Sequence, residues 1–367
     1  MNRQTALRLS CAALLLTLSA ACNGFFTNEP STPPPTTVVP KFAFVANSGS
    51  GNVSAYTVNS TSGALTAVSS SPFAAGATPR TAGADSSGTF LYVANEDGGV
   101  SGYSINRTTG ALAAIAGSPF AAGTTPTGVA VDPTARVVYV ANNGSGDVSG
   151  FTANSTTGVL ASVGATTPAG ALPLRLREDP AGRFLYVASG AEGVFIFGVN
   201  QTTGVLTAPA AGNLAGADSR DVLVEATGKY AYVADGGGMV IAYAVNASTG
   251  ELTAVASGSF AAGTTPVALA TDSAGKFLYV ANQGSNNVSA FKINADGTLT
   301  VISGSPFGGL SAPVSVSVAP GDKFLYVANS SGATSVSVFT INATTGALAA
   351  ASTATAGTAP SSVVTTK

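Results

Sequence analysis

Seven copies of one six-residue string restrict this chain to a repeat fold. FLYVAN occurs unchanged at 90–95, 277–282 and 324–329, and its near-copies are FAFVAN (42–47), VVYVAN (137–142), FLYVAS (184–189) and YAYVAD (230–235). The third residue of each copy is Tyr or Phe, and successive third residues are 48, 47, 47, 46, 47 and 47 positions apart. A period of this length indicates one supersecondary unit repeated seven times.

Each unit contains four short strand signals separated by turn signals. In the third unit the strand signals are 127–131, 136–141, 147–153 and 159–165. The turn before the last strand contains Asn in every unit, because Asn and the Gly that follows tolerate the positive φ of a tight strand reversal. These residues are Asn59, Asn106, Asn154, Asn200, Asn246, Asn294 and Asn342. Four strands at this period predict an all-β fold, a seven-bladed β-propeller with four antiparallel strands per blade.

The two ends of the repeat region favour a closed ring over the alternative, an open solenoid. The first copy, at 42–47, has no inner strand before it, whereas GTAPSSVVTT at 357–366 matches inner strands such as GTTPTGVAVD at 123–132. We therefore expect the C-terminal strand to complete the first blade and close the ring, which leaves no exposed edge. The FLYVAN strand is apolar at consecutive positions, which a strand needs when neighbouring blades cover both of its faces.

The repeat resembles that of a known family. The YVAN strand, the Pro-led inner strand and the Asp-x-x-Gly-Lys turn look like the YVTN-type repeats of the seven-bladed lactonase propellers, which include 6-phosphogluconolactonase-like and muconate-cyclising enzymes. The resemblance covers about residues 41–367. It implies the propeller fold and a lactone hydrolase activity. Family enzymes generally place His, Arg and Glu around the ring entrance, and this chain departs from that pattern because it has no His.

The N-terminus predicts export and lipid anchoring. Residues 1–21 combine two early Arg residues, the apolar run 9–18 and small residues before Cys22, which is the pattern of an export signal. The end of this segment resembles a bacterial lipobox, so we expect lipidation at Cys22, with ordinary cleavage after Ala21 as the alternative. Residues 22–40 are rich in Pro and Thr and read as a tether. The expected location is the bacterial cell envelope, with a lipid anchor in its membrane.

Composition excludes several functions. Without the two signal-segment Arg residues, 13 basic residues face 17 acidic ones, a formal charge of −4, so we expect no nucleic-acid partner. The absence of His excludes Ser-His-Asp hydrolysis and histidine metal sites. We find no phosphate loop or dinucleotide fingerprint in a strand–helix context and no EF-hand spacing, and so predict no cofactor and no metal. We expect a monomer.

Charges outside the repeated turns gather at one face of the predicted ring, mainly in the fourth and fifth units. Arg80 and Arg220 come one residue after the first residue of their inner strands, and Arg175 and Arg177 come two and four residues after Pro173. The predicted ligand-binding residues are Arg80, Arg175, Arg177, Arg220 and Asp235. The predicted catalytic acids are Asp221 and Glu192, either of which would act as a base toward a lactone carbonyl.

Two interpretations of this charged face remain open. In the first, ion pairs plug a narrow channel, and they are formed by Arg175, Arg177, Asp221 and Glu178. In the second, an Arg pair beside carboxylates holds an anionic ligand bidentately. From the residues we favour a lipoprotein propeller that binds a small anion, a lactone or a protein partner at the charged mouth of the ring. The alternative is a lactone hydrolase that acts on a sugar or a related lactone.

Overall fold

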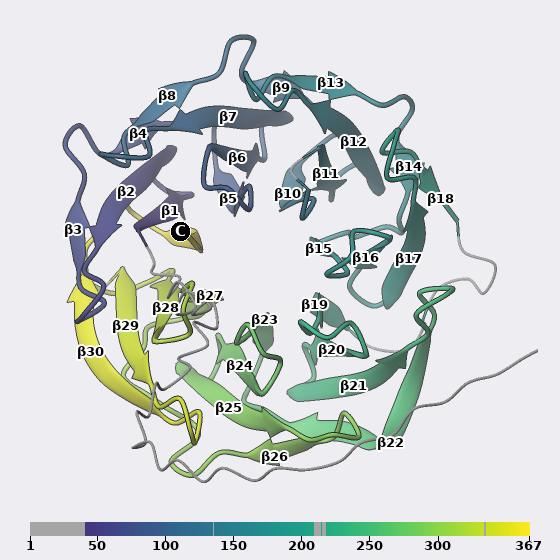
Figure 1. The fold of residues 1–367 in the computed structure, drawn as a ribbon, viewed down its shortest axis with the longest axis vertical. Coiled ribbons are helices and arrows are strands. Elements are labelled where there is room, and N and C mark those ends of the chain that lie inside the picture. The colour runs from purple at the N-terminus through teal and green to yellow at the C-terminus, as the bar shows by residue number, and fades with distance from the viewer. Residues whose placement is uncertain (1–40, 135, 209–213, 215–217, 334) are drawn as a thin grey trace, which may run out of the picture. The chain divides into compact units, whose positions relative to one another are not determined.

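The computed structural model describes residues 41–367 except 135, 209–213, 215–217 and 334. The predicted signal segment, Cys22 and the tether lie outside the described residues. Every described element is a β-strand, and the strands form seven separate sheets set around a central channel, as Figure 1 shows. Among the described residues there is no helix with the length and apolar character needed to cross a membrane. The predicted seven-bladed propeller is confirmed.

The strands of each blade run from the channel outward in chain order, except in the first blade. Blade 1 contains β31 (Pro360–Thr366), β1 (Phe42–Asn47), β2 (Asn52–Val58), β3 (Leu65–Ala67) and β4 (Phe73–Ala74). Blade 2 contains β5 (Pro79–Ala84), β6 (Phe90–Asn95), β7 (Gly99–Ile105), β8 (Leu112–Ala114) and β9 (Phe120–Ala121). Blade 3 contains β10 (Pro126–Val131), β11 (Val137–Asn142), β12 (Asp147–Ala153), β13 (Leu160–Ser162) and β14 (Thr167–Pro168).

The remaining four blades have four strands each. Blade 4 contains β15 (Arg175–Glu178), β16 (Phe184–Ala188), β17 (Val194–Val199) and β18 (Leu206–Thr207). Blade 5 contains β19 (Ser219–Val224), β20 (Tyr230–Asp235), β21 (Met239–Val245) and β22 (Leu252–Ala261). Blade 6 contains β23 (Pro266–Thr271), β24 (Phe277–Asn282), β25 (Asn287–Ile293) and β26 (Leu299–Val301), and blade 7 contains β27 (Pro313–Val318), β28 (Phe324–Asn329), β29 (Val336–Ile341) and β30 (Leu348–Ala354).

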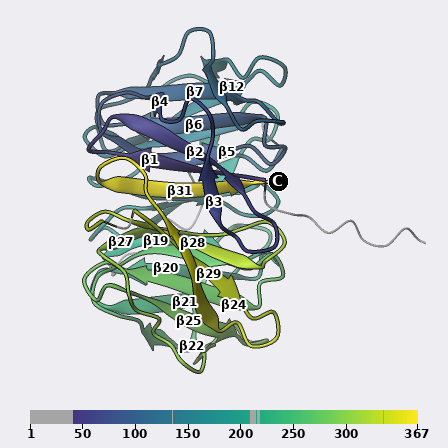
Figure 2. The same cartoon turned by 90° about the vertical axis from the view of Figure 1, so that its left-hand side faces the viewer.

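The C-terminal strand closes the ring, as predicted. β31 pairs antiparallel with β1, with Phe42 opposite Thr366 and Val45 opposite Val363. Figure 2 shows β31 lying beside β1, although these strands come from opposite ends of the described chain. The innermost strand of blade 1 is therefore supplied by the last residues of the chain, and no blade is left without its channel-side strand.

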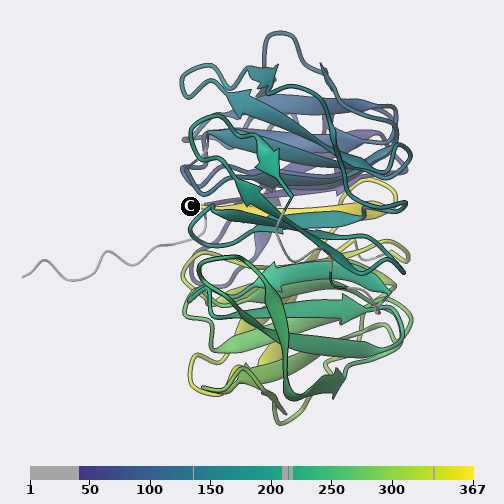
Figure 3. The same ribbon diagram turned by 90° about the vertical axis from the view of Figure 1, so that its right-hand side faces the viewer.

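The hydrophobic core lies between blades rather than inside any one of them. Seven clusters of buried apolar side chains occur in the described residues, and each joins two neighbouring blades around the ring. Figure 3 shows the ring from the side, with the sheets of neighbouring blades next to one another. All six residues of each FLYVAN copy are buried, which explains why this strand is apolar at consecutive positions.

In six of the seven copies a Tyr also ties its blade to the next by a hydrogen bond. Tyr279 is fully buried, and its hydroxyl donates to the Gly346 carbonyl in the outer turn of blade 7, at 3.0 Å. Gly346 adopts φ of +72°, and a Cβ there would clash with the Phe277 ring, so the turn needs Gly for both reasons. The other such bonds are Tyr92–Gly158, Tyr139–Gly204, Tyr186–Gly250, Tyr232–Gly297 and Tyr326–Gly63.

Blade 1 breaks this pattern because its third residue is Phe44, which has no hydroxyl. The equivalent turn Gly in blade 2 is Gly110, which has φ of +75° and packs against Phe42 as Gly346 packs against Phe277. The junction between blades 1 and 2 therefore has the same apolar packing as the other junctions but lacks the buried hydroxyl–carbonyl bond.

We expect Phe44→Tyr to stabilise the protein by about 1 kcal/mol, because it adds the hydrogen bond to Gly110 that the other six junctions contain. The matched control, Tyr279→Phe, should destabilise by about 1–3 kcal/mol because it leaves a buried carbonyl without its donor. Urea unfolding at equilibrium measures both changes. A destabilised Phe44→Tyr protein would show that the first junction has no room for the hydroxyl.

Candidate functional site

A β-bulge in six of the seven inner strands turns one side chain toward the channel. In blade 4, Leu174, which precedes β15, holds the equivalent position in the sequence. The pairing of β5 with β6 skips Arg80, which lies between Pro79 and Thr81, and the same shift occurs in the innermost strands of blades 1, 3, 5, 6 and 7. A bulged residue leaves the regular alternation of the strand, so its side chain can point along the axis of the ring. The residues at this position are Ser361, Arg80, Thr127, Leu174, Arg220, Val267 and Val314.

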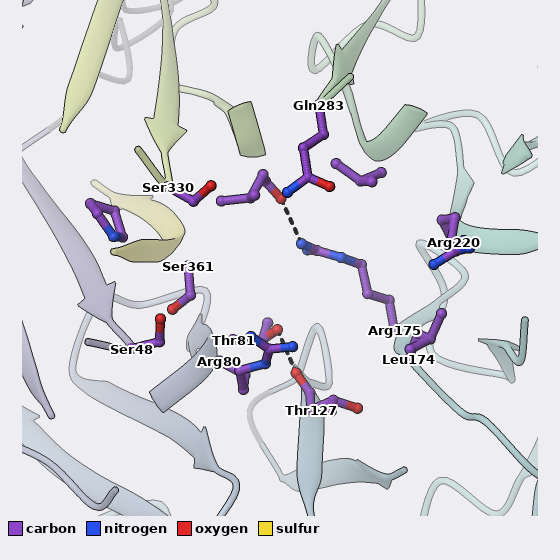
Figure 4. Close-up of a pocket in the computed structure, with 13 residues that line it drawn as sticks. Ser48, Arg80, Thr81, Thr127, Leu174, Arg175, Arg220, Gln283, Ser330 and Ser361 are labelled. Carbon is purple, nitrogen blue, oxygen red and sulfur yellow. Dashed lines mark hydrogen bonds between the residues drawn. The ribbon is translucent and has the colours of Figure 1, made fainter. Parts of the chain in front are cut away.

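All seven of these residues line one cavity of about 350 Å³ at a mouth of the channel, as Figure 4 shows. We call it the mouth cavity. Three more lining residues, Ser48, Gln283 and Ser330, directly follow the last residue of a second strand. The Arg residues were identified from the sequence, but these polar neighbours were missed. The aligned repeats contained a signal for them, because the bulged position and the position after the second strand each recur once per blade and vary freely between blades.

Arg175 is the most deeply placed cation of the mouth cavity. Its Nη2 donates to the Val314 carbonyl at 2.8 Å, a bond that reaches from blade 4 to blade 7 across the channel. Burial lowers the pKa of the Arg175 guanidinium, the nearby Asp221 carboxylate raises it, and Arg177 and Arg80 lower it. An arginine keeps its charge under such conditions. Among the described residues, no carboxylate forms an ion pair with Arg175.

The other two arginines of the mouth cavity are paired at its rim. The Arg80 Nε lies 2.9 Å from Glu96 Oε1, and the Arg220 Nη2 lies 2.6 Å from Asp218 Oδ2. All four side chains are between 31% and 46% exposed, so each pair contributes little to stability. The carboxylates neutralise the two rim cations and leave Arg175 as the unpaired charge at the floor.

Arg177 points into a second cavity, of about 310 Å³, deeper in the channel, which we call the lower cavity. Its guanidinium pairs with Asp221 at 3.2 Å and also donates to the Leu269 carbonyl. Arg175 lines both cavities and therefore lies between them. The predicted Arg175–Arg177 pair is thus divided, because one guanidinium faces the mouth cavity and the other is held by a buried carboxylate.

Asp221 joins two blades. It is fully buried, and its Oδ2 accepts the Leu269 N–H of the next blade at 2.9 Å while Oδ1 accepts the Val222 N–H at 3.0 Å. Ser315 and Ser362 occupy the same position in their blades and accept the equivalent N–H groups across their junctions. Both Asp221 oxygens already accept hydrogen bonds. A catalytic role for Asp221 stays a prediction, and Asp221 would have to play that role while it makes these bonds.

Glu192 and Asp235 lie on the same face but line neither cavity. Glu192 is exposed, and its Oε1 accepts the Ala171 N–H at 2.9 Å. Asp97 makes the equivalent loop contact in blade 2, where it accepts the Ala77 N–H. Asp235 stands where other copies have Asn, and its Oδ1 accepts the Asp218 N–H at 3.1 Å, as Asn142 accepts the Gly123 N–H. The structure therefore places both residues in loop contacts, outside the lining of the two cavities.

Glu178 lines the lower cavity without any hydrogen-bond partner in the described residues, although both of its carboxyl oxygens are buried. Burial, and to a smaller extent the charges of Asp132 and Asp179, raise its pKa to about 8. Other blades have Ala84, Val131, Val224 or Val318 at this position, or a Thr. Glu178 is thus an acid in an otherwise uncharged ring of the channel wall, and no cluster of three metal-ligating side chains forms among the described residues.

The fold is a closed seven-bladed propeller with an arginine-floored cavity at one mouth of its channel. The family model of the seven-bladed β-propeller lactonases matches residues 36–120 and 98–365, so the chain belongs to this family. No curated protein sequence matches the chain.

Solved structures share the fold. A candidate 6-phosphogluconolactonase from Bacteroides fragilis is 22% identical, with 91% of this chain and 100% of that chain covered and a TM-score of 0.76. A second, from Bacteroides uniformis, is 21% identical, with 90% and 99% covered and a TM-score of 0.76. The periplasmic gluconolactonase of Pseudomonas aeruginosa is 21% identical, with 89% and 99% covered and a TM-score of 0.73.

We expect Glu178→Gln to stabilise the protein in alkaline solution and to leave it unchanged near pH 4. A raised pKa means that the folded state favours the protonated acid, so ionisation costs stability progressively as the pH rises from 4.5 to about 8. Each pH unit between these two pKa values costs at most about 1.4 kcal/mol. Unfolding measured from pH 4 to pH 9 tests this, with Glu251→Gln on an outer turn as control. An equal effect at both ends of the range would contradict it.

Proposed function

We propose that this protein hydrolyses a lactone in the mouth cavity. Membership of the lactonase propeller family supports the reaction class, and three neighbours of the same fold have lactonase names. The single observation that supports this site is Arg175, a charged donor at the floor of a cavity of about 350 Å³ whose hydrogen bond goes to a main-chain carbonyl. A guanidinium has five N–H donors, so this one bond leaves others that a carbonyl oxygen of a ligand can accept.

The reaction needs a donor where negative charge develops. Water adds to the lactone carbonyl carbon, the bond from this carbon to the ring oxygen breaks, and the ring oxygen leaves with a proton as the new hydroxyl. The acid that forms releases its proton to solvent. Charge accumulates on the carbonyl oxygen as water adds, and a fixed guanidinium stabilises it more strongly than it stabilises the neutral ground state. In this proposal Arg175 holds that oxygen and then the product carboxylate.

The main-chain amides nearest the ends of the six-residue copies do not supply this donor. The residue that follows each copy has its N–H bonded to a main-chain carbonyl in every blade, at 2.9 to 3.3 Å. These residues are Ser48, Glu96, Asn143, Gly190, Gly236, Gln283 and Ser330. The role therefore goes to side chains, and Arg175 has the charge and the depth that it requires.

Water activation requires a carboxylate within reach of the mouth. The lining of the mouth cavity contains Arg80, Arg175 and Arg220 but no acid. Glu96 and Asp218 are brought to its rim by their bonds to Arg80 and Arg220. In the proposed mechanism one of these two carboxylates orients or deprotonates the attacking water.

We expect Arg175→Met to lower kcat/KM for lactone hydrolysis by about 10²–10³, because it removes the donor to the developing oxyanion. Arg175→Lys should retain part of the activity through its charge. Arg107→Ala, on an exposed outer turn, is the matched control and should behave as wild type. A proton-release assay with purified protein and a panel of γ- and δ-lactones measures these rates.

The same assay separates the candidate bases. Glu96→Gln or Asp218→Asn should abolish most of the turnover while the fold is retained. Loss of activity in Glu192→Gln or in a folded Asp221→Asn would instead support the acids predicted from the sequence. A folded wild-type protein that turns over no lactone would contradict the enzyme proposal and favour the binding or scaffold role.

We further propose that the chain is exported and acylated at Cys22, which would place the propeller at a membrane of the cell envelope. The support is the signal-like segment 1–21 and the small residues before Cys22. Mass spectrometry of the mature protein should find a lipid-modified N-terminal Cys22, and Cys22→Ser should remove the protein from the membrane fraction. A mature wild-type protein with an unmodified N-terminus would contradict this proposal.

A further inference from the structure

One side of the mouth cavity presents hydroxyl groups whose protons are already used. The Ser48 hydroxyl donates to the Ala359 carbonyl at 2.8 Å, and the Ser330 hydroxyl donates to the Ala312 carbonyl at 3.0 Å. The Ser361 hydroxyl donates to the Pro79 carbonyl at 2.6 Å. The Thr81 and Thr127 hydroxyls donate in the same way to the carbonyls of Thr127 and Pro173.

A carbonyl can only accept a hydrogen bond, so each of these hydroxyls must be the donor. Each hydroxyl oxygen keeps its lone pairs, and these are what it can offer to a ligand in the cavity. A ligand group that needs a donor would have to break a bond to the main chain and leave a carbonyl without a partner. Blades 1, 2, 3 and 7 therefore provide a hydrogen-bond acceptor surface.

Donors lie on the other side of the cavity. Figure 4 shows Ser48, Ser330 and Ser361 on one side of the Arg175 guanidinium and Arg220 on the other, with Gln283 above. The amides that directly follow the six-residue copies are bonded to main-chain carbonyls, as described above. The cavity thus has two chemically different sides, an acceptor surface of serines and threonines and a donor surface centred on Arg175.

The rim cations do not supply a free phosphate site. A phosphate group has only acceptors when it is fully ionised and needs donors and positive charge. Arg80, the cation nearest the acceptor surface, already pairs with Glu96 at 2.9 Å. A phosphate placed there would compete with that carboxylate and would face hydroxyl oxygens that have no proton to donate.

From this polarity we infer that the mouth cavity selects an unphosphorylated polyhydroxy lactone, with its carbonyl on Arg175 and its hydroxyl groups donating to Ser48, Ser330 and Ser361. This inference rests on the proposed lactonase function and adds which end of the substrate faces which wall. The three serines act as specificity-determining residues, since they contact substrate groups that take no part in bond breaking.

The first test compares two substrates. Wild-type protein should hydrolyse glucono-1,5-lactone with a kcat/KM at least about tenfold above that for the 6-phosphorylated lactone, because the phosphate meets an acceptor surface. A preference for the phosphorylated substrate would overturn the inference while leaving the proposed hydrolysis intact. If neither lactone is turned over, the hydrolysis proposal fails. Calorimetry with gluconate and 6-phosphogluconate then decides the inference, which requires tighter binding of gluconate.

The second test separates recognition from folding. Ser330→Ala and Ser48→Ala should each lower kcat/KM for glucono-1,5-lactone by about tenfold, because each removes one acceptor. Neither change should affect δ-valerolactone, which has no hydroxyl groups to donate. Ser145→Ala, on the same face but outside the cavity, is the matched control. An equal loss with both lactones, or no loss with either, would overturn the assignment of these serines.

Discussion

The ring depends on one contact that is made at each junction between blades. An aromatic or apolar residue at the start of the second strand packs against a Gly in the outer turn of the next blade, as Phe277 packs against Gly346. In six junctions a buried Tyr hydroxyl then donates to the carbonyl of that same Gly. Because a blade has no core of its own, its stability comes from these junctions, and each copy must match its neighbour on both sides.

This constraint separates the positions that can vary from those that cannot. The second strand is buried between blades, so its sequence repeats. The bulged residue of the inner strand faces the channel, and in the described part of the chain only Ser361 and Thr127 use this position to donate to a carbonyl of the next blade. That position holds Ser, Thr, Leu, Val or Arg in different blades. The repeated residues build the ring, and the chemistry of the mouth cavity comes from the side chains that differ between copies.

The period and the strand pattern inside each unit were sufficient to predict the fold and the strand order within a blade. The match of 357–366 to the other inner strands then predicted the closing strand. The arginines were also identifiable, since Arg80, Arg175 and Arg220 stand out from the repeat. Glu192 and Asp235 stood out equally, yet each makes a loop contact that a different residue type makes in another blade. The direction of a serine hydroxyl and the missing partner of Glu178 depend on neighbours distant in sequence and required the structure.

The arrangement of charge along the channel explains how an arginine can remain available in a confined space. A carboxylate bonded directly to Arg175 would block its donors. If there were no negative charge nearby, nothing would offset the cost of burying the guanidinium charge. Asp221 avoids both outcomes, because its oxygens are bonded to Arg177 and to two main-chain amides while its charge still raises the pKa of Arg175. The counter-charge is thus fixed beside the guanidinium by a junction contact. A residue that joins blades 5 and 6 in this way also supplies a counter-charge for Arg175 and leaves the hydrogen-bond donors of Arg175 accessible.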